Sequence, residues 1–204
     1  MGKIRWLQSS DMPLWDSFVG KHPYGTIYHL SSWKSLVERS FKHIEGHFAA
    51  LFTDDSNEIL AGIPVYAIRS RFTGNRIVSI PFATLCDPLI SSADEMRQFL
   101  PFLIDIYKKN NASNIEIRTR QSTALTSLES LGRNDFYYHH YLVLDRADDV
   151  LLKSFHKNAV QISIVKAKRN NLQLGFARDD SDLSVFFDIF AKSRKRLGLP
   201  LTPY

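Results

Sequence analysis

Cysteine, long apolar runs and glycine-rich loops are scarce or absent in this sequence. Its 204 residues include a single cysteine, Cys86, which excludes a disulfide framework and a metal site built on paired thiols. No stretch approaches the roughly 20 apolar residues of a membrane span. No apolar run follows the charged amino terminus, as it would in a signal peptide. A cytoplasmic location is the expectation that follows.

Recognisable catalytic motifs are absent as well. The sequence contains neither a Gly-x-Ser-x-Gly motif nor a P-loop, and Cys86 is expected to be a buried small side chain rather than a nucleophile. The seven histidines indicate no metal site, because no third ligand is spaced to join His43 and His47 or the adjacent His139 and His140. An enzyme with this sequence would work by positioning and electrostatics, without a covalent intermediate.

Charge is distributed unevenly along the chain. Residues 1–150 contain 16 Lys and Arg against 17 Asp and Glu, whereas residues 151–204 contain 10 against 4. The net charge of +5 therefore comes from the last quarter of the sequence. Such a one-sided distribution favours an anionic partner, although a lysine run taken alone is more often a solvated helix face.

Hydrophobic periodicity predicts a mixed α/β fold. Strands joined by short turns form an antiparallel meander, and helices then alternate with strands, which gives a mixed sheet with parallel strands towards the end. In chain order we expect a strand over 3–8, helices over 11–20 and 33–43, strands over 47–53, 58–69 and 76–81, a helix from 92, a strand over 114–119, a helix over 123–131 and a strand over 136–145.

Two prolines and a capping motif refine these expectations. Ser92, with Glu95 three residues later, matches a capping box at the start of a helix. Pro101 inside that helix predicts a kink or a break into two pieces. Pro64 predicts that the second strand of the meander is an edge strand or carries a bulge.

The end of the chain predicts a further group of elements. Asp148 is expected to cap one long basic helix, which is apolar on two faces and therefore packed on two sides. A strand over 172–177 and a helix capped by Ser181 or Asp182 follow, and Gly198 ends that helix. The expected division is a first domain over 1–147, a basic connecting helix over 148–171 and the beginning of a second domain over 172–204.

The last predicted helix has an apolar face without a partner. Phe186, Phe187 and Phe190 form that face, and no strand follows to cover it. We therefore expect the chain to be a piece of a longer protein that ends within its second domain, with little or no activity by itself. The alternative is that this helix packs back on the first domain.

Several stretches resemble the FemAB-type aminoacyltransferases and their relatives. Residues 155–158 (FHKN) and 164–169 (IVKAKR) look like the family's basic helix with a Lys-Ala pair, which leads into a second domain. Residues 193–200 (SRKRLGLP) resemble the Thr/Ser-x-x-Arg-x-Gly pattern that closes the first helix of that domain. Upstream, residues 26–33 (TIYHLSSW) resemble an aromatic-Gln-x-x-x-Trp segment, and residues 82–89 a strand end marked by Pro and Asp.

The resemblance implies both a fold and an activity. The fold would be two tandem GNAT-like (acyl-CoA N-acyltransferase-like) α/β domains, each a mixed sheet with flanking helices. The activity would be transfer of an amino acid from aminoacyl-tRNA to an amine of a nucleotide- or lipid-linked precursor of the cell wall or of an envelope polysaccharide. The implied partners are aminoacyl-tRNA, that precursor and, peripherally, the inner membrane face. No cofactor and no metal are implied.

The resemblance also indicates which residues would bind substrate. His29 stands where relatives carry Gln, and Val160 and Val165 stand where many carry basic residues. No catalytic base is indicated. The residues expected to hold the phosphates of the acceptor or the end of the tRNA, most of them in a cleft between the two domains, are Lys157, Lys166, Arg169, Arg196, Tyr204 and Trp33.

Two other functions remain open from the sequence. A CoA-dependent GNAT acetyltransferase would need a glycine-rich pyrophosphate loop between a strand and a helix, and no glycine lies near 161–163 to form one. A non-catalytic module that binds RNA or an anionic surface through the basic helix would show steep salt dependence without turnover.

Overall fold

The chain folds as two compact units, residues 1–137 and residues 138–204, which are described here separately. The computed structural model describes residues 2–54, 58–83, 86–119, 132, 138 and 140–201. Within that part, no helix is long and apolar enough to cross a membrane.

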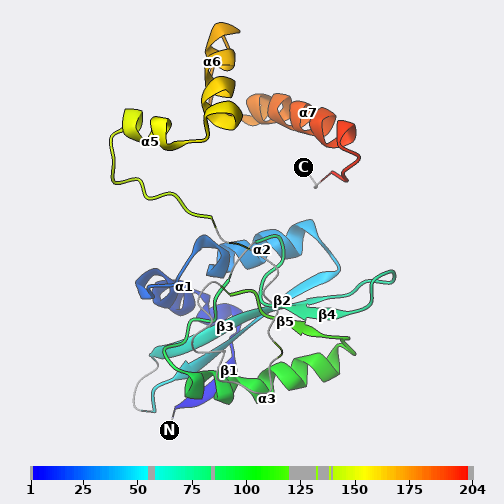
Figure 1. Cartoon of the computed structure of the whole chain (residues 1–204). Coiled ribbons are helices and arrows are strands. Elements are labelled where there is room, and N and C mark those ends of the chain that lie inside the picture. The colour runs from blue at the N-terminus through cyan, green and yellow to red at the C-terminus, as the bar shows by residue number, and fades with distance from the viewer. Residues whose placement is uncertain are drawn as a thin grey trace. The chain divides into compact units, whose positions relative to one another are not determined.

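The first unit is built on a five-stranded mixed sheet in the order β1-β2-β3-β4-β5 (Figure 1). The first three pairs of neighbouring strands are antiparallel, and β4 and β5 are parallel. This arrangement confirms the predicted meander followed by a parallel strand. The strands are β1 (Lys3–Trp6), β2 (Ile44–Phe52), β3 (Ile59–Ile68), β4 (Arg76–Val78) and β5 (Ile115–Glu116).

Helices cover both faces of this sheet, with α1 and α2 on one face and α3 on the other (Figure 1). Short 3-10 turns precede α1 and α2. The predicted mixed α/β class is therefore confirmed for this unit. The elements are η1 (Ser9–Asp11), α1 (Met12–Lys21), η2 (Ile27–His29), α2 (Ser31–Ser40) and α3 (Ala93–Lys109).

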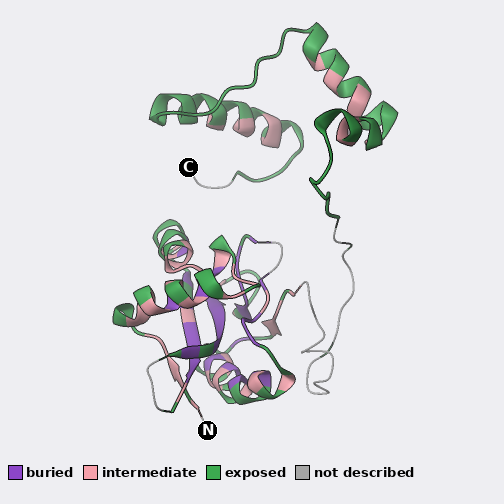
Figure 2. Ribbon diagram, turned by 90° about the vertical axis from the view of Figure 1, so that its left-hand side faces the viewer, coloured by how far each residue is buried: buried purple, intermediate pink, exposed green. Residues whose placement is uncertain are grey.

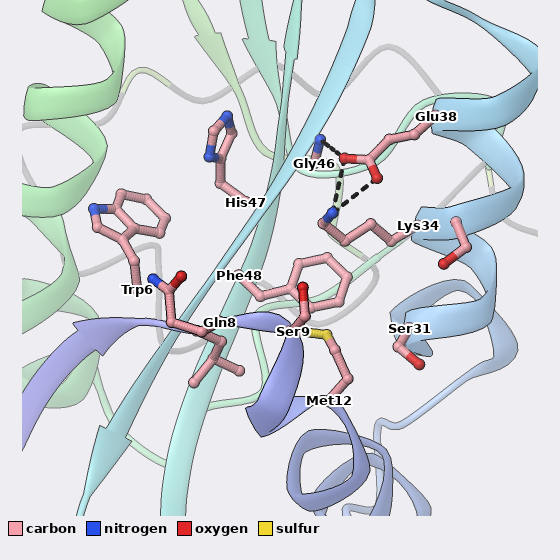
Figure 3. Close-up of a pocket in the computed structure, with 12 residues that line it drawn as sticks. Trp6, Gln8, Ser9, Met12, Ser31, Lys34, Glu38, Gly46, His47 and Phe48 are labelled. Atoms are coloured by element: carbon pink, nitrogen blue, oxygen red, sulfur yellow. Dashed lines mark hydrogen bonds and ion pairs between the residues drawn. The ribbon is translucent and has the colours of Figure 1, made fainter.

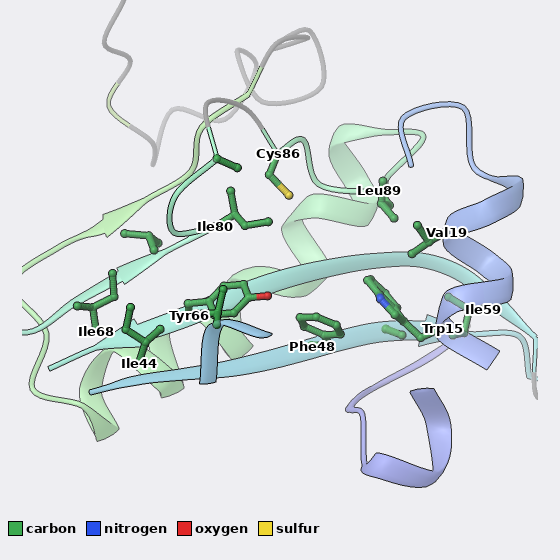
Figure 4. Close-up of a cluster of buried hydrophobic side chains, with 14 of the residues drawn as sticks. Trp15, Val19, Ile44, Phe48, Ile59, Tyr66, Ile68, Ile80, Cys86 and Leu89 are labelled. Carbon is green, nitrogen blue, oxygen red and sulfur yellow. The ribbon is translucent and has the colours of Figure 1, made fainter. Parts of the chain in front are cut away.

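The core of the first unit consists of two apolar clusters, one on each face of the sheet. Trp15 of α1 is fully buried in the first cluster, against Phe48 of β2 (Figure 4). The other cluster joins α3 to the opposite face, through Phe99 and Leu103 among others. The alternation of side chains along β2 and β3 supplies both clusters, because successive residues point to opposite faces.

Pro64 lies inside the sheet, so the predicted edge position is wrong, and the register shift between β2 and β3 falls at Ile59–Ala61 rather than at Pro64. β3 pairs with β2 along its length and with β4 at Tyr66–Ile68. The N–H of Gly62 points away from β2 and donates to Leu89 O, and the nitrogen of Pro64, two residues later, faces the same side. Since the described pairing with β4 starts only at Tyr66, the missing N–H removes no ladder hydrogen bond.

α3 begins as predicted and continues without a break. The Ser92 Oγ accepts the N–H of Glu95 at 3.2 Å, which caps the helix. Pro101 lies within one continuous helix from Ala93 to Lys109, so the predicted break into two pieces is wrong. The carbonyl that loses its partner is that of Arg97, an exposed residue, where water can replace the hydrogen bond.

Two elements are predicted between residues 123 and 145, where many residues lie outside the described part of the chain. The predicted helix over 123–131 lies outside the described residues. Of the predicted strand over 136–145, the structure describes Tyr138 and 140–145, and these residues form no strand. A β-strand depends on a ladder partner, so apolar alternation alone is not sufficient for one to form.

The second unit consists of helices whose residues are mostly exposed (Figure 2). The predicted single helix over 148–171 is interrupted. Phe155 is extended, and the Nδ1 of His156 accepts the N–H of Ala159 at 3.2 Å, which starts a new helix. The side-chain amide of Gln161 donates to Phe155 O at 2.7 Å, which gives a hydrogen-bond partner to the carbonyl group at the carboxyl end of α5. The elements are α5 (Asp148–Ser154), the π-helical turn η3 (Lys157–Gln161), α6 (Ile162–Arg169) and α7 (Asp180–Arg196).

The predicted strand over 172–177 does not form among the described residues, and its side chains are exposed. α7 is capped by Asp179, whose carboxylate accepts the N–H of Asp182 at 2.9 Å, rather than by Ser181 or Asp182. The end of α7 agrees with the prediction, because Gly198 has a φ of +67° and directly follows its last turn.

Candidate functional site

A pocket of about 410 Å³ lies at the edge of β2, where β1 ends (Figure 3). β1 pairs with β2 as far as Trp6, and one further hydrogen bond joins Leu7 N–H to Phe48 O at 2.7 Å. Beyond that point α2 supplies the other wall. The pocket is lined by Trp6, Leu7, Gln8, Ser9, Met12, Ser31, Lys34, Ser35, Glu38, Gly46, His47 and Phe48.

An ion pair between two turns of α2 borders the pocket. Lys34 Nζ donates to both carboxylate oxygens of Glu38, at 2.8 Å each, and Gly46 N–H donates to Glu38 Oε1 at 2.8 Å. The carboxylate thus covers a backbone group on the open edge of β2. Because an ammonium group has three donors, one proton of Lys34 remains available to a ligand.

Gly46 allows this close approach of α2 to the sheet. A Cβ at Gly46 would lie 2.9 Å from Lys34 Cγ and 2.9 Å from Tyr66 Cε1. The stem of Lys34 and the ring of Tyr66 therefore pack directly against the glycine backbone. Any larger residue there would displace the lysine whose ammonium group borders the pocket.

His47 lies beside the pocket, but its ring points away from Lys34 and Glu38 (Figure 3). It packs edge-on against Trp6, with ring centroids 5.9 Å apart. Burial lowers the pKa of His47, and the nearby Glu45 carboxylate opposes that shift. The imidazole is therefore neutral near pH 7. Its Nε2 is buried and, within the described residues, forms no hydrogen bond.

His29 and Cys86 form a buried pair that does not have the properties of a nucleophile and its base. His29 Nδ1 accepts the N–H of Thr26 at 3.1 Å, so the proton is on Nε2, which donates to Asp87 O at 2.9 Å. The Cys86 Sγ lies 3.2 Å from Nε2. Burial raises the pKa of the Cys86 thiol and lowers the pKa of His29, so both stay neutral. Cys86 is buried, as expected.

The residues predicted to bind substrate lie in both units. Lys157 starts η3, Lys166 and Arg169 lie in the last turn of α6, and Arg196 ends α7; all four are exposed. Tyr204 lies outside the described residues. A common cleft for these residues therefore stays a prediction.

Trp33 is the predicted site residue that belongs to the first unit. It is half-buried on α2 and packs edge-on against Tyr28, with ring centroids 4.9 Å apart. Its Nε1 is buried without a hydrogen-bond partner among the described residues. Sequence reasoning found Trp33 but missed Lys34 and Glu38 beside it, although their i,i+4 spacing with opposite charge was visible.

No metal site is found in the part of the chain that the structure describes, since no three His, Cys, Asp or Glu side chains lie close enough together to hold an ion. No family model matches the sequence, and no curated protein matches it.

The solved structure of FemX matches this chain with a TM-score of 0.61 and 18% identity, over 98% of this chain and 52% of FemX. The chain shares the fold of FemX. It spans about half of the length of FemX. The expected mixed sheet with flanking helices is thereby confirmed.

Acetyltransferase structures match more weakly. One is a probable acetyltransferase, with a TM-score of 0.44 and 13% identity over 71% of this chain and 99% of the other. Another is glucosamine-6-phosphate N-acetyltransferase from Arabidopsis thaliana, with a TM-score of 0.46 and 15% identity over 70% of this chain and 99% of the other. Matches this weak carry no argument about function.

Proposed function

We propose that this chain is part of an N-acyltransferase that moves an amino acid from aminoacyl-tRNA to an amine of a cell-wall or envelope-polysaccharide precursor. The observation that carries the proposal is the likeness to FemX, which extends over 98% of the chain and therefore includes both units. The FemAB-type motifs near Trp33, Lys166 and Arg196 support the same conclusion from the sequence.

The proposed reaction needs no nucleophile from the protein. The acceptor amine attacks the carbonyl carbon of the aminoacyl ester, a C–N bond forms, and the C–O bond to the tRNA ribose breaks. The amine loses a proton, and the ribose oxygen gains one. The buried, protonated Cys86 fits this scheme, because an ester is already activated towards an amine.

The charge of the second unit fits two polyanionic substrates. Residues 151–204 have six more basic than acidic residues, and Lys157, Lys166 and Arg169 are exposed. We propose that these side chains contact phosphates of the tRNA or of the acceptor. Arg196 and Tyr204 are proposed to contact the same phosphates.

The pocket beside β2 is proposed to hold a polar part of the acceptor. Its lining combines the remaining donor of Lys34 with the hydroxyl groups of Ser9 and Ser35 and the amide of Gln8. These groups can bind hydroxyl, amide or carboxylate groups by hydrogen bonds. Trp33, next to Lys34 on α2, is proposed to contact the same ligand.

Removing two positive charges from α6 tests the proposal that its basic side chains bind phosphates. Lys166→Ala with Arg169→Ala should weaken binding of aminoacyl-tRNA by about tenfold and reduce the slope of log K against log salt by about 1 to 2. Filter binding at several salt concentrations measures both quantities. Unfolding by urea should be unchanged, because both side chains are exposed.

Lys3→Ala with Arg97→Ala is the matched control, since it removes the same charge from exposed positions of the first unit. Equal binding by the α6 variant and the wild type would contradict the assignment. Saturable binding of acetyl-CoA would instead favour a CoA-dependent acetyltransferase. Equal affinity for charged tRNA and for unrelated RNA, with no transfer by the protein that contains this chain, would favour a non-catalytic module.

A further inference from the structure

The β3–β4 hairpin presents an isolated aromatic side chain to solvent. The hairpin, drawn in teal, projects beyond the sheet in Figure 1. Phe72 at its tip is 99% exposed, more than the other large apolar side chains described. Full exposure leaves the apolar surface of the Phe72 ring in water, where a partner can bury it.

The tip of the hairpin is an ordered turn. Ser70 Oγ accepts the N–H of Phe72 at 3.3 Å and the N–H of Thr73 at 3.1 Å. Gly74 follows with a φ of +75°, a conformation that favours glycine. The backbone therefore holds the Phe72 ring outward.

The base of the hairpin is tied to the end of α3. Asn75 Nδ2 donates to Asn110 O at 2.8 Å, and the N–H of Ser113 donates to Asn75 O at 2.8 Å. Arg69 also reaches Asn110, whose side-chain oxygen it contacts at 3.3 Å. The hairpin and the carboxyl end of α3 thus form one end of the unit.

Basic side chains from three separate stretches gather at this end. The strand register places Ile68 opposite both Ile44 and Arg76, so the start of β2, the end of β3 and the start of β4 are neighbours. We call the resulting surface the basic end; it consists of Arg39, Lys42, Arg69, Arg71, Arg76, Lys108 and Lys109, all exposed.

Most of these cations have no acidic partner. Of the cations of the basic end, only Arg69 and Lys109 form ion pairs within the described part of the chain, with Glu45 at 2.9 Å and with Asp105 at 2.8 Å. Residues 1–137 as a whole contain 15 Lys and Arg against 14 Asp and Glu. A nearly neutral unit therefore concentrates its positive charge around one exposed phenylalanine.

We propose that the basic end is a docking surface for an anionic phospholipid membrane, with Phe72 inserted among the headgroups. A convex tip that carries one aromatic ring between Arg71 and Arg76 fits a planar surface, where arginines bind phosphates and the ring enters the interface. Single-stranded RNA would instead need several aromatic rings along a groove for its bases to stack on. This inference goes beyond the proposed transfer reaction and does not depend on it.

Vesicle sedimentation tests the proposal with the whole chain. We expect binding to vesicles of phosphatidylcholine with 30% phosphatidylglycerol, weak binding to phosphatidylcholine alone, and loss of binding in high salt. Phe72→Ser should reduce the partition coefficient about tenfold, because part of the ring's apolar surface is no longer buried. Arg71→Gln with Arg76→Gln should reduce it about thirtyfold, at about 1 kcal/mol for each charge near the surface.

Two controls separate this surface from the basic second unit. Lys3→Gln with Arg97→Gln removes equal charge far from the hairpin, since Lys3 pairs with Phe52 at the opposite end of β2, and should bind like the wild type. Lys166→Ala with Arg169→Ala should leave insertion of the hairpin intact. Insertion is measured as quenching of Phe72→Trp fluorescence by brominated lipid.

Two results would overturn the proposal. One is vesicle binding by Phe72→Ser equal to that of the wild type. The other is binding of single-stranded RNA that is lost in the hairpin variants, while no variant and no wild-type chain binds vesicles. Circular dichroism of each variant verifies that the exposed substitutions leave the fold unchanged.

Discussion

Replacing Gly62 with alanine is expected to destabilise the first unit by about 3 kcal/mol or more, a cost at the upper end for overpacked cores. A Cβ at Gly62 would lie 2.2 Å from Trp15 Cζ3 and 2.8 Å from Trp15 Cη2. The indole cannot move aside, because it is fully buried and its Nε1 donates to His29 O at 2.7 Å. Urea unfolding followed by tryptophan fluorescence measures the loss.

Gly20→Ala is the matched control for this substitution. No atom lies within 4 Å of a Cβ built at Gly20, and the residue lies in the last turn of α1. Alanine there should stabilise the unit by about 0.5 to 1 kcal/mol, because it has the higher helix propensity. A double variant, Gly62→Ala with Trp15→Phe, should lose less stability than the two single changes together, since the smaller ring makes room for the new methyl group.

A loss of less than about 1 kcal/mol for Gly62→Ala would contradict the packing of α1 on β3 that the structure shows. So would equal effects of Gly62→Ala and Gly20→Ala, because only at Gly62 would the new methyl group meet other atoms at close range.

Replacing His29 with alanine is expected to cost about 3 kcal/mol, because it empties a fully buried side-chain position and leaves Thr26 N–H and Asp87 O without their partner. His29→Gln should cost less, since an amide can both accept from Thr26 and donate to Asp87. Thermal or urea unfolding at pH 7.5 measures both variants. Equal losses for the two would show that the hydrogen bonds of His29 do not link η2 to the loop before α3.

The same residue should make stability depend on pH. Burial lowers the pKa of His29 below the 6.5 of an unperturbed histidine, so its contribution is complete above pH 6.5. As the pH falls below 6.5, the unfolded chain takes up the proton first, and stability decreases until the pH reaches the folded-state pKa. The slope for one such group approaches 1.4 kcal/mol per pH unit, roughly.

Urea unfolding at intervals from pH 7.5 to pH 5 measures this slope. His29→Gln should show a smaller decrease than the wild type, and the decrease that remains comes from His22 and His47, whose pKa values burial also lowers. His140→Gln, which removes an exposed histidine, is the control and should follow the wild type. A slope that is unchanged in His29→Gln would show that His29 takes up no extra proton on unfolding.

Local signals predicted the local structure well. Asp11 directly precedes α1 as predicted, although its side chain makes no capping hydrogen bond to that helix. Ser92 before α3 and Gly198 after α7 also lie where the sequence placed helix ends. These positions are readable because capping hydrogen bonds join residues only a few positions apart. Apolar runs bounded by turns likewise predicted β2 and β3, whose side chains supply the clusters on both faces of the sheet.

Predictions failed where a competing contact or a missing partner decided the outcome. The predicted long basic helix is interrupted after Ser154. The His156 side chain caps the start of the next helical segment, and the Gln161 side chain donates to the carbonyl group of Phe155 at the end of α5. The strand predicted over 172–177 does not form among the described residues, because a strand needs a neighbour that the local sequence does not supply.

The sequence by itself determined the class of fold, the helix ends and the uneven charge, since each depends on composition or on contacts between near neighbours. Only the tertiary structure decided which residues meet. Glu38 reaches Gly46 across the edge of β2, and the register of β2, β3 and β4 gathers cations from three stretches around Phe72. Neither arrangement is visible in one dimension, because the first depends on how α2 packs against β2 and the second on which strands pair and in which register.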